Sequence, residues 1–124
     1  MKLMNKRLIF TTTTEIVRVP AESVVFITAD GNYSAITLAD GENFVLTLQL
    51  GQIERRIAEM LDKDDHRFIR IGKSLIVNRD FIAFIHPVRQ KMILSDCCNF
   101  RHEVSASKDA LKALKELLEK EERI

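Results

Sequence analysis

Short hydrophobic stretches separated by turn residues fill the first half of the chain. β-Branched and other apolar side chains, which favour strands, are concentrated at residues 7–10, 16–19, 24–28, 33–38 and 44–48. The last three stretches are separated by Asp30-Gly31-Asn32 and by Asp40-Gly41, residue types typical of tight turns. The pattern therefore predicts a β-meander.

The spacing of apolar residues changes after the meander. Leu50, Ile53 and Ile57 recur three or four residues apart, which predicts an amphipathic helix at residues 49–61. Apolar stretches bounded by polar breaks then predict further strands at residues 68–71, 75–77, 81–85, 91–94 and 100–104.

A second helix is predicted at the end of the chain, over residues 108–122. Ser107 is a suitable N-cap, and Asp109 places a carboxylate in the first turn, where it suits the helix dipole. An apolar stripe on one side, which either caps the core or contacts a partner, consists of Leu111, Leu114 and Leu118. We therefore expect a mainly β fold with two helices.

Length and composition fit one soluble domain over residues 1–124. Hydrophobic residues make up 46% and charged residues 30% of the 124 positions. No apolar run approaches the ~18 residues that a transmembrane helix needs, and the first 20 residues lack the continuous apolar core of a secretory signal. We expect no membrane association.

The only cysteines, Cys97 and Cys98, are adjacent in sequence. Neighbouring side chains on a strand point to opposite faces, so this pair would not join two parts of the fold. We expect one cysteine in the core and the other exposed. This cysteine usage predicts a reducing, cytoplasmic environment.

The formal net charge of +1 conceals an uneven distribution. Residues 20–65 carry a net −6, whereas residues 66–91 carry six basic residues against Asp80 alone, for +5. A local excess of this size is typical of a face that binds a polyanion. It is equally compatible with charges scattered over opposite, solvated faces.

The sequence contains no arrangement that predicts catalysis. His66, His86 and His102 stand at no metal-ligand spacing, and no phosphate-binding glycine loop or nucleophile elbow occurs. The acidic cluster at residues 62–65 is more typical of a solvated helix end than of a calcium loop. We therefore expect no enzymatic activity, no metal and no cofactor.

The most informative segment is residues 68–79, which predicts two strands around a short polar break. Gly72 permits a sharp turn, which would present Lys73 and Ser74 on an exposed loop. Lysine can contact phosphate or guanine, and serine can donate to a phosphate oxygen. We assign Asn78 a structural role, because asparagine readily bonds its own backbone at turns.

This segment resembles the core pattern F-x-R-x-H-[RK]-S-x-x-V-N of the LytTR-type DNA-binding domain of bacterial transcription regulators. The matching residues are Phe68, Arg70, Lys73, Ser74, Val77 and Asn78. Residues 24–33 are similar to the family's I-x-Y-I-E-A-x-x-N-Y segment, and Val104-Ser105 is similar to its V-S-R motif. The resemblance extends over about residues 8–118.

The resemblance implies small antiparallel sheets packed side by side, with loops that enter successive major grooves and bend the DNA. Residue by residue, it implies a first contact loop with Tyr33 and Ser34, a second with Lys73 and Ser74, and a third with Ser107 and Lys108. From the charge distribution alone we add as phosphate-contact candidates Arg79, Arg89 and Lys91.

The chain departs from the family pattern at three points. Gly72 stands where the family often has histidine, and Ala106 stands where it commonly has arginine. Only about seven residues precede the first predicted strand, so we expect a stand-alone domain without the receiver domain of response regulators.

Two functions therefore stay open. The first is a sequence-specific transcription regulator that binds double-stranded DNA, as expected on tandem repeats, alone or as a dimer or with a regulatory partner protein. The second is a protein-interaction module that keeps the fold without binding DNA.

Overall fold

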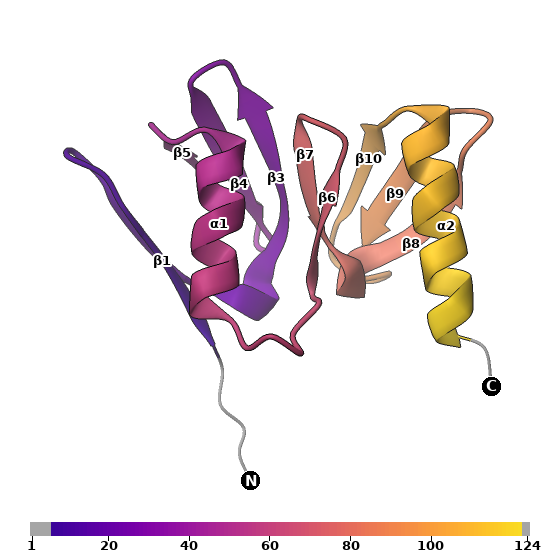
Figure 1. Cartoon of the computed structure of the whole chain (residues 1–124), viewed down its shortest axis with the longest axis horizontal. Helices are drawn as coiled ribbons and strands as arrows, with labels where there is room; N and C mark the ends of the chain where they lie inside the picture. Colours follow the sequence, from indigo (N-terminus) through magenta and orange to yellow (C-terminus); the bar gives the residue numbers. More distant parts are fainter. Residues whose placement is uncertain (1–5, 123–124) are drawn as a thin grey trace, which may run out of the picture. The chain divides into compact units, whose positions relative to one another are not determined.

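The computed structural model of the chain describes residues 6–122, and it consists of two compact units (Figure 1). The N-terminal unit ends at Arg79, and the C-terminal unit begins at Asp80. Each unit contains buried apolar residues.

The N-terminal unit contains two antiparallel sheets. Its two-stranded sheet consists of β1 (Arg7–Thr11) and β2 (Ile16–Pro20). The short 3-10 helix η1 (Ala21–Ser23) follows. The five-stranded sheet has the order β5-β4-β3-β7-β6, with β3 (Val24–Asp30), β4 (Tyr33–Leu38), β5 (Asn43–Leu46), β6 (Phe68–Ile71) and β7 (Leu75–Asn78).

Helix α1 (Leu50–Met60) connects β5 to β6 and supplies the predicted amphipathic face. The backbone N–H of Gln49 donates to Oε1 of Gln52 at 2.8 Å, so a donor at the start of the helix is satisfied locally. Leu50, Ile53 and Ile57 are buried, as their spacing predicts. The helix therefore directs one apolar face into the core.

The core of the N-terminal unit lies between α1, the β1–β2 ribbon and one face of the five-stranded sheet. Ile27 on the central strand β3 is paired in register with Ile36 on β4 and with Ile76 on β7. The two-stranded ribbon contributes Leu8 and Phe10, which are both fully buried. Non-directional apolar burial of this kind is the main favourable term in folding.

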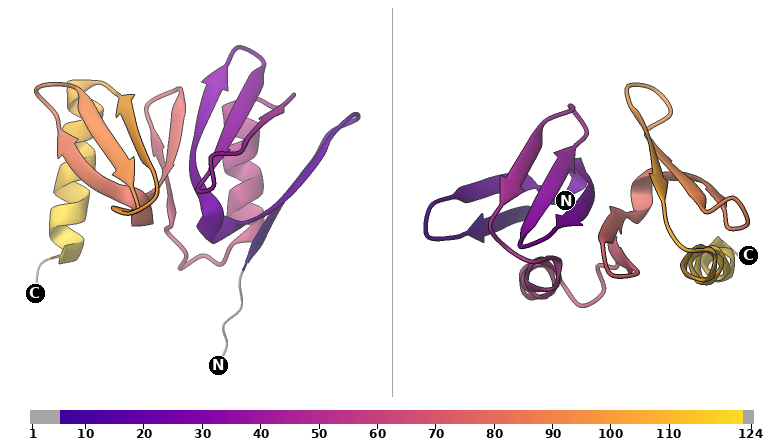
Figure 2. Two further views of the ribbon diagram at one scale, coloured as in Figure 1. Left: turned by 180° about the vertical axis from the view of Figure 1, so that it is seen from behind. Right: turned by 90° about the horizontal axis from the view of Figure 1, so that it is seen from above.

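The C-terminal unit is a three-stranded antiparallel sheet with one helix (Figure 2). It begins within the 3-10 helix η2 (Arg79–Phe81), and the strands have the order β10-β9-β8. Its elements are β8 (Ile82–His86), β9 (Lys91–Ser95), β10 (Arg101–Ser105) and α2 (Lys108–Glu122). The buried apolar side chains are Met92, Leu94, Leu111 and Leu114.

The predicted cap of the last helix is confirmed. The backbone N–H of Ala110 donates to Oγ of Ser107 at 3.1 Å, as an N-cap serine requires. The wider prediction of a mainly β fold, with antiparallel sheets, a helix after the meander and a C-terminal helix, is also confirmed. Neither helix is long and apolar enough to span a membrane, within the residues that the structure describes.

The prediction for the two cysteines is wrong. Cys97 and Cys98 are both exposed and lie in the turn between β9 and β10 rather than on a strand. The Asp96 carboxylate accepts hydrogen bonds from the backbone N–H groups of Cys98, Asn99 and Phe100. This local network favours a turn, in which Cys97 adopts a φ of 62°.

Candidate nucleic-acid interface

Two turns of the N-terminal unit lie at the same end of the five-stranded sheet (Figure 1). One connects β3 to β4 at residues 31–32, and the other connects β6 to β7 at residues 72–74. The pairing of Thr28 with Leu75 brings them together, and the backbone N–H of Ala29 donates to the carbonyl of Ser74 at 2.9 Å. The first two predicted contact loops are therefore neighbours.

The β6–β7 turn presents the side chains that its sequence predicts. Gly72 has a φ of 61°, a left-handed conformation that glycine adopts without strain. Lys73 and Ser74 are exposed, and Lys73 makes no ion pair with any of the residues 6–122. A free ammonium group at a sheet end can reach a phosphate or an acceptor on a base edge.

The β3–β4 turn divides its two predicted contact residues between surface and interior. Tyr33 is 49% exposed. Ser34 is fully buried, and its hydroxyl donates to the carbonyl of Leu48 at 2.8 Å. Ser34 therefore anchors the chain that leads into α1, and its buried hydroxyl is not presented at the surface as the predicted DNA contact requires.

Two residues at this end were not identified from the sequence. Nε2 of Gln49 donates to Oδ1 of Asn32 at 3.3 Å, so the start of α1 is joined to the β3–β4 turn. Asn32 had been interpreted only as a turn residue, and Gln49 only as the start of a helix. Their proximity depends on packing between α1 and the sheet, which no local pattern encodes.

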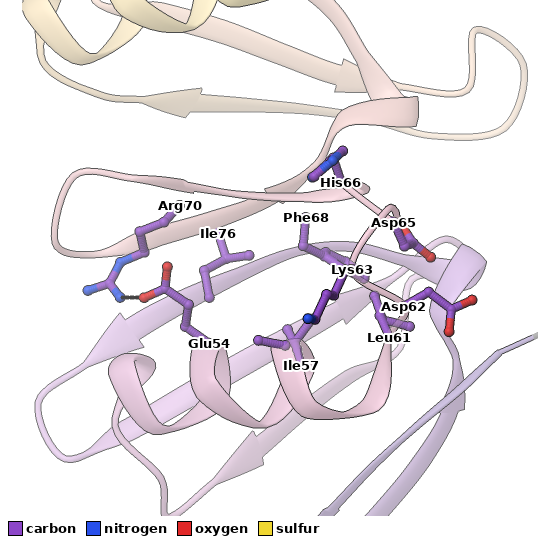
Figure 3. A pocket seen from close by; sticks show the side chains of 11 residues that line it. Glu54, Ile57, Leu61, Asp62, Lys63, Asp65, His66, Phe68, Arg70 and Ile76 are labelled. Atoms are coloured by element: carbon purple, nitrogen blue, oxygen red, sulfur yellow. Dashed lines mark hydrogen bonds and ion pairs between the residues drawn. The ribbon is translucent and has the colours of Figure 1, made fainter.

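A cavity of about 340 Å³ lies between α1 and strand β6 (Figure 3). Its apolar lining includes Ile57, Phe68 and Ile76. Nη1 of Arg70 donates to Oε1 of Glu54 at 2.7 Å, and this ion pair lies in the wall of the cavity. No sequence feature predicted this cavity.

The C-terminal unit gathers its predicted residues in a similar way, at the end of its sheet where β9 begins. Ser105 is paired in register with Lys91, and the backbone N–H of Ala106 reaches the carbonyl of Gln90 at 3.4 Å. The start of α2 thus lies beside the β8–β9 turn. The predicted contact residues at this end are Arg89, Lys91, Ser107 and Lys108.

These four side chains differ in how exposed they are and in whether they already have a partner within the chain. Arg89, Ser107 and Lys108 are exposed. Nζ of Lys91 is 3.7 Å from Oε1 of Glu103, an acidic residue on the neighbouring strand β10. The hydroxyl of Ser107 already accepts the cap hydrogen bond but keeps its own proton to donate.

The excess of positive charge in residues 66–91 is partly neutralised. Arg67 pairs with Asp65 at 3.4 Å, and Arg70 and Lys91 pair with the glutamates described above. Arg79 is half-buried in η2 and has further interactions of its own. Some of these bases are therefore held in ion pairs within the fold, whereas Lys73 and Arg89 are exposed to solvent.

The three histidines do not form a site together. His66 lines the cavity, whereas Nδ1 of His86 accepts the backbone N–H of Arg89 at 3.3 Å. His102 packs against the ring of Phe100. Across residues 6–122, no group of three or more histidine, cysteine or acidic side chains is arranged to hold a metal ion.

A protein-family model described as the LytTr DNA-binding domain matches residues 14–119. The chain belongs to the LytTr DNA-binding domain family. The match includes both units and every candidate contact residue named above. Membership of this family makes the chain a DNA-binding domain and supports the general role of a DNA-binding regulator.

A solved structure agrees with this assignment. The LytTr DNA-binding domain of a protein described as a methyl-accepting/DNA response regulator from Bacillus cereus is similar to the chain, with a TM-score of 0.60. The two sequences are 24% identical over 93% of this chain and 98% of the other, a likeness that shows the LytTr fold. A comparison with curated proteins gave no match.

Proposed function

We propose that this LytTr domain is a sequence-specific transcription regulator that inserts loops into successive major grooves of double-stranded DNA. The observation that carries the proposal is the exposed, unpaired Lys73 on a turn that the sheet holds beside Tyr33. Loops at the end of a rigid sheet can present side chains to base edges without a recognition helix.

In the N-terminal unit, the contact set is Lys73, Ser74 and Tyr33. The ammonium group of Lys73 suits the O6 and N7 acceptors that guanine presents in the major groove. The hydroxyl of Ser74 suits a phosphate or a base edge, and the ring of Tyr33 offers an apolar surface with a polar tip. Recognition of bases would reside in this unit.

In the C-terminal unit, the contact set is Arg89, Lys91, Ser107 and Lys108. The start of α2 carries the positive end of the helix dipole, which favours a phosphate. The basic side chains in this set add electrostatic attraction that does not depend on base sequence. This unit would therefore supply affinity more than sequence discrimination.

The first test selects the DNA site directly. The purified chain is incubated with a pool of random duplexes at two salt concentrations, and the retained DNA is sequenced. We expect enrichment of a short, spaced repeat that persists at moderate salt. Retention without enrichment, lost as salt rises, would contradict sequence-specific recognition.

The second step tests the contact assignment on the selected site. Lys73→Ala should weaken binding at least about fivefold, because a good base contact contributes about 1–3 kcal/mol, and thermal stability should change little. Lys63→Ala is the matched control: Lys63 is also exposed, but it follows the far end of α1, a helix about 16 Å long. Wild-type affinity in Lys73→Ala, or early unfolding, would contradict the assignment.

A further inference from the structure

The guanidinium group of Arg70 contacts the β6–β7 turn at two successive carbonyl groups. Nε donates to the carbonyl of Gly72 at 3.1 Å, and Nη2 donates to the carbonyl of Lys73 at 3.0 Å. A third nitrogen, Nη1, donates to Glu54 on α1 at 2.7 Å (Figure 3). One planar group therefore joins the turn to the helix.

The position of Arg70 in the sheet explains how it reaches both partners. Arg70 is paired in register with Ile76, which packs in the core between the sheet and α1, so its side chain leaves β6 on the side that faces the helix. Only 26% of the side chain is exposed. The donors of a guanidinium group form a rigid, planar fork, so three hydrogen bonds hold the group in one orientation.

We propose that Arg70, held by Glu54, is a positioning residue that fixes the β6–β7 turn so that Lys73 is aimed at DNA. The inference rests on the proposed function, because it concerns how that contact is oriented. The carbonyl of Lys73 is itself one of the acceptors, so the clamp acts directly on the backbone of the contact residue. A contact residue fixed before binding loses less entropy when the complex forms.

This role differs from that of a basic residue that touches phosphate. All three nitrogens of the Arg70 guanidinium are already donating within the chain, and its charge is balanced by Glu54. Removal of a phosphate contact weakens binding to all sequences and lowers the slope of log K against log salt by about one. Removal of a positioning residue should weaken binding to the selected site and leave that slope unchanged.

The test uses Arg70→Gln and Glu54→Gln in the full chain, with Arg55→Gln as the control. Arg55 is exposed on α1 and has no bonding partner among the described residues, so its variant changes the same charge without touching the turn. We expect Arg70→Gln to weaken binding to the selected site about tenfold and Glu54→Gln about threefold. Equal losses on selected and unrelated duplexes, with a smaller salt slope, would overturn the proposal.

A double-mutant cycle tests whether Arg70 acts through Lys73. In the Lys73→Ala background, Arg70→Gln should reduce affinity by less than about twofold, because the side chain that it positions is already gone. Independent, multiplicative losses would overturn the proposal. Arg70→Lys, which keeps the charge but not the fork, should rescue the affinity only in part and also covers the case in which Arg70→Gln does not fold.

A readout without DNA separates this inference from the proposed function. Backbone NMR order parameters of Lys73 and Ser74 should fall in Arg70→Gln and in Arg70→Lys, and should be unchanged in Arg55→Gln. Unchanged order parameters would overturn the clamp whatever the DNA data show. If the order parameters fall while Lys73→Ala binds as well as wild type, the clamp stands and the proposed contact fails.

Discussion

The two units each gather candidate DNA-contact residues at one end of a sheet, but they support them differently. In the N-terminal unit, the turn that carries Lys73 is joined to α1 through Arg70 and to β3 through the carbonyl of Ser74. In the C-terminal unit, the corresponding link between the β8–β9 turn and the start of α2 is a backbone hydrogen bond of 3.4 Å, from Ala106 to Gln90.

This difference matches two kinds of DNA contact. A side chain can hydrogen-bond to a base edge only within a narrow range of positions. A residue that recognises bases therefore binds better when its backbone is held rigidly. A phosphate attracts a cation over a longer range and carries no sequence information. The difference in support favours the proposal that the N-terminal unit recognises bases and the C-terminal unit attracts phosphates.

The largest expected effect is on the free energy of unfolding. It tests whether side-chain hydrogen bonds stabilise the N-terminal unit more than the C-terminal unit. Asn78 is fully buried, and its Nδ2 donates to the carbonyl of Val24 at 2.8 Å. Asn78→Ala leaves that carbonyl unpaired and should lower the free energy of unfolding by about 1–3 kcal/mol. Unfolding in urea measures the loss.

The control for this prediction is the same exchange in the C-terminal unit. Asn99 is exposed in the β9–β10 turn, where its Nδ2 donates to Asp96 at 3.1 Å. Asn99→Ala should cost less than about 0.5 kcal/mol. A loss from Asn99→Ala equal to that from Asn78→Ala would remove the contrast between the two units.

A smaller effect, on DNA affinity, tests whether the C-terminal unit contacts phosphates rather than bases. Lys108→Ala removes an exposed cation at the start of α2 and should weaken binding about threefold on selected and unrelated duplexes alike. The slope of log K against log salt should fall by about one. Lys112→Ala, one helical turn further along the same exposed side, is the control and should change neither quantity. A loss confined to the selected site would instead assign base recognition to Lys108.

The smallest effect is on the stability of the C-terminal unit at acid pH. It concerns the β9–β10 turn, at the end of the sheet away from Lys108. Hydrogen bonds from backbone N–H groups, that of Asn99 foremost, lower the pKa of Asp96 from 3.8 to about 2. A lowered pKa in the folded state means that the carboxylate stabilises the fold above its ordinary pKa, and that this contribution is lost as pH falls from 3.8 through 2.

Unfolding curves of the wild type and of Asp96→Ala at several pH values test this prediction. We expect the variant to be the less stable protein near neutral pH and the difference to shrink as pH falls toward 2. DNA binding near neutral pH should be unchanged. A difference in stability that is constant with pH would show that the carboxylate charge has no part in holding the turn.

Features that follow from local hydrophobic periodicity, or from a single residue type with few structural roles, could be predicted from the sequence. The helical spacing of Leu50, Ile53 and Ile57 fixes which side of α1 is buried, and it is buried in the structure. The cap at Ser107 followed from what a serine before a helix can bond, and its partner is three residues away. Asn78 is structural, but the predicted reason is wrong: it lies on β7 and bonds the carbonyl of Val24, 54 residues away, rather than its own backbone at a turn.

The rest depended on contacts between distant segments. Alternation along β4 does not reveal that Ser34 faces the carbonyl of Leu48, so its burial was missed. Asp96 lies next to the cysteines, but its capacity to accept from three backbone donors was not recognised, and one cysteine was wrongly expected in the core. The clamp requires Glu54 on α1 and Arg70 on β6, 16 residues apart, to meet at the wall of the cavity.

The backbone conformation of Gly72 determines which other residues could occupy its position. A Cβ added there would meet no atom within 4 Å, so the turn requires a handedness of the backbone rather than a small residue. A mirror-image D-alanine prefers this backbone conformation, whereas ordinary L-alanine would be strained in it by about 1–2 kcal/mol. Histidine, which the family pattern often has here, is among the L-residues that enter the left-handed region more readily. Glycine in its place therefore preserves the chirality of the turn and removes only the imidazole.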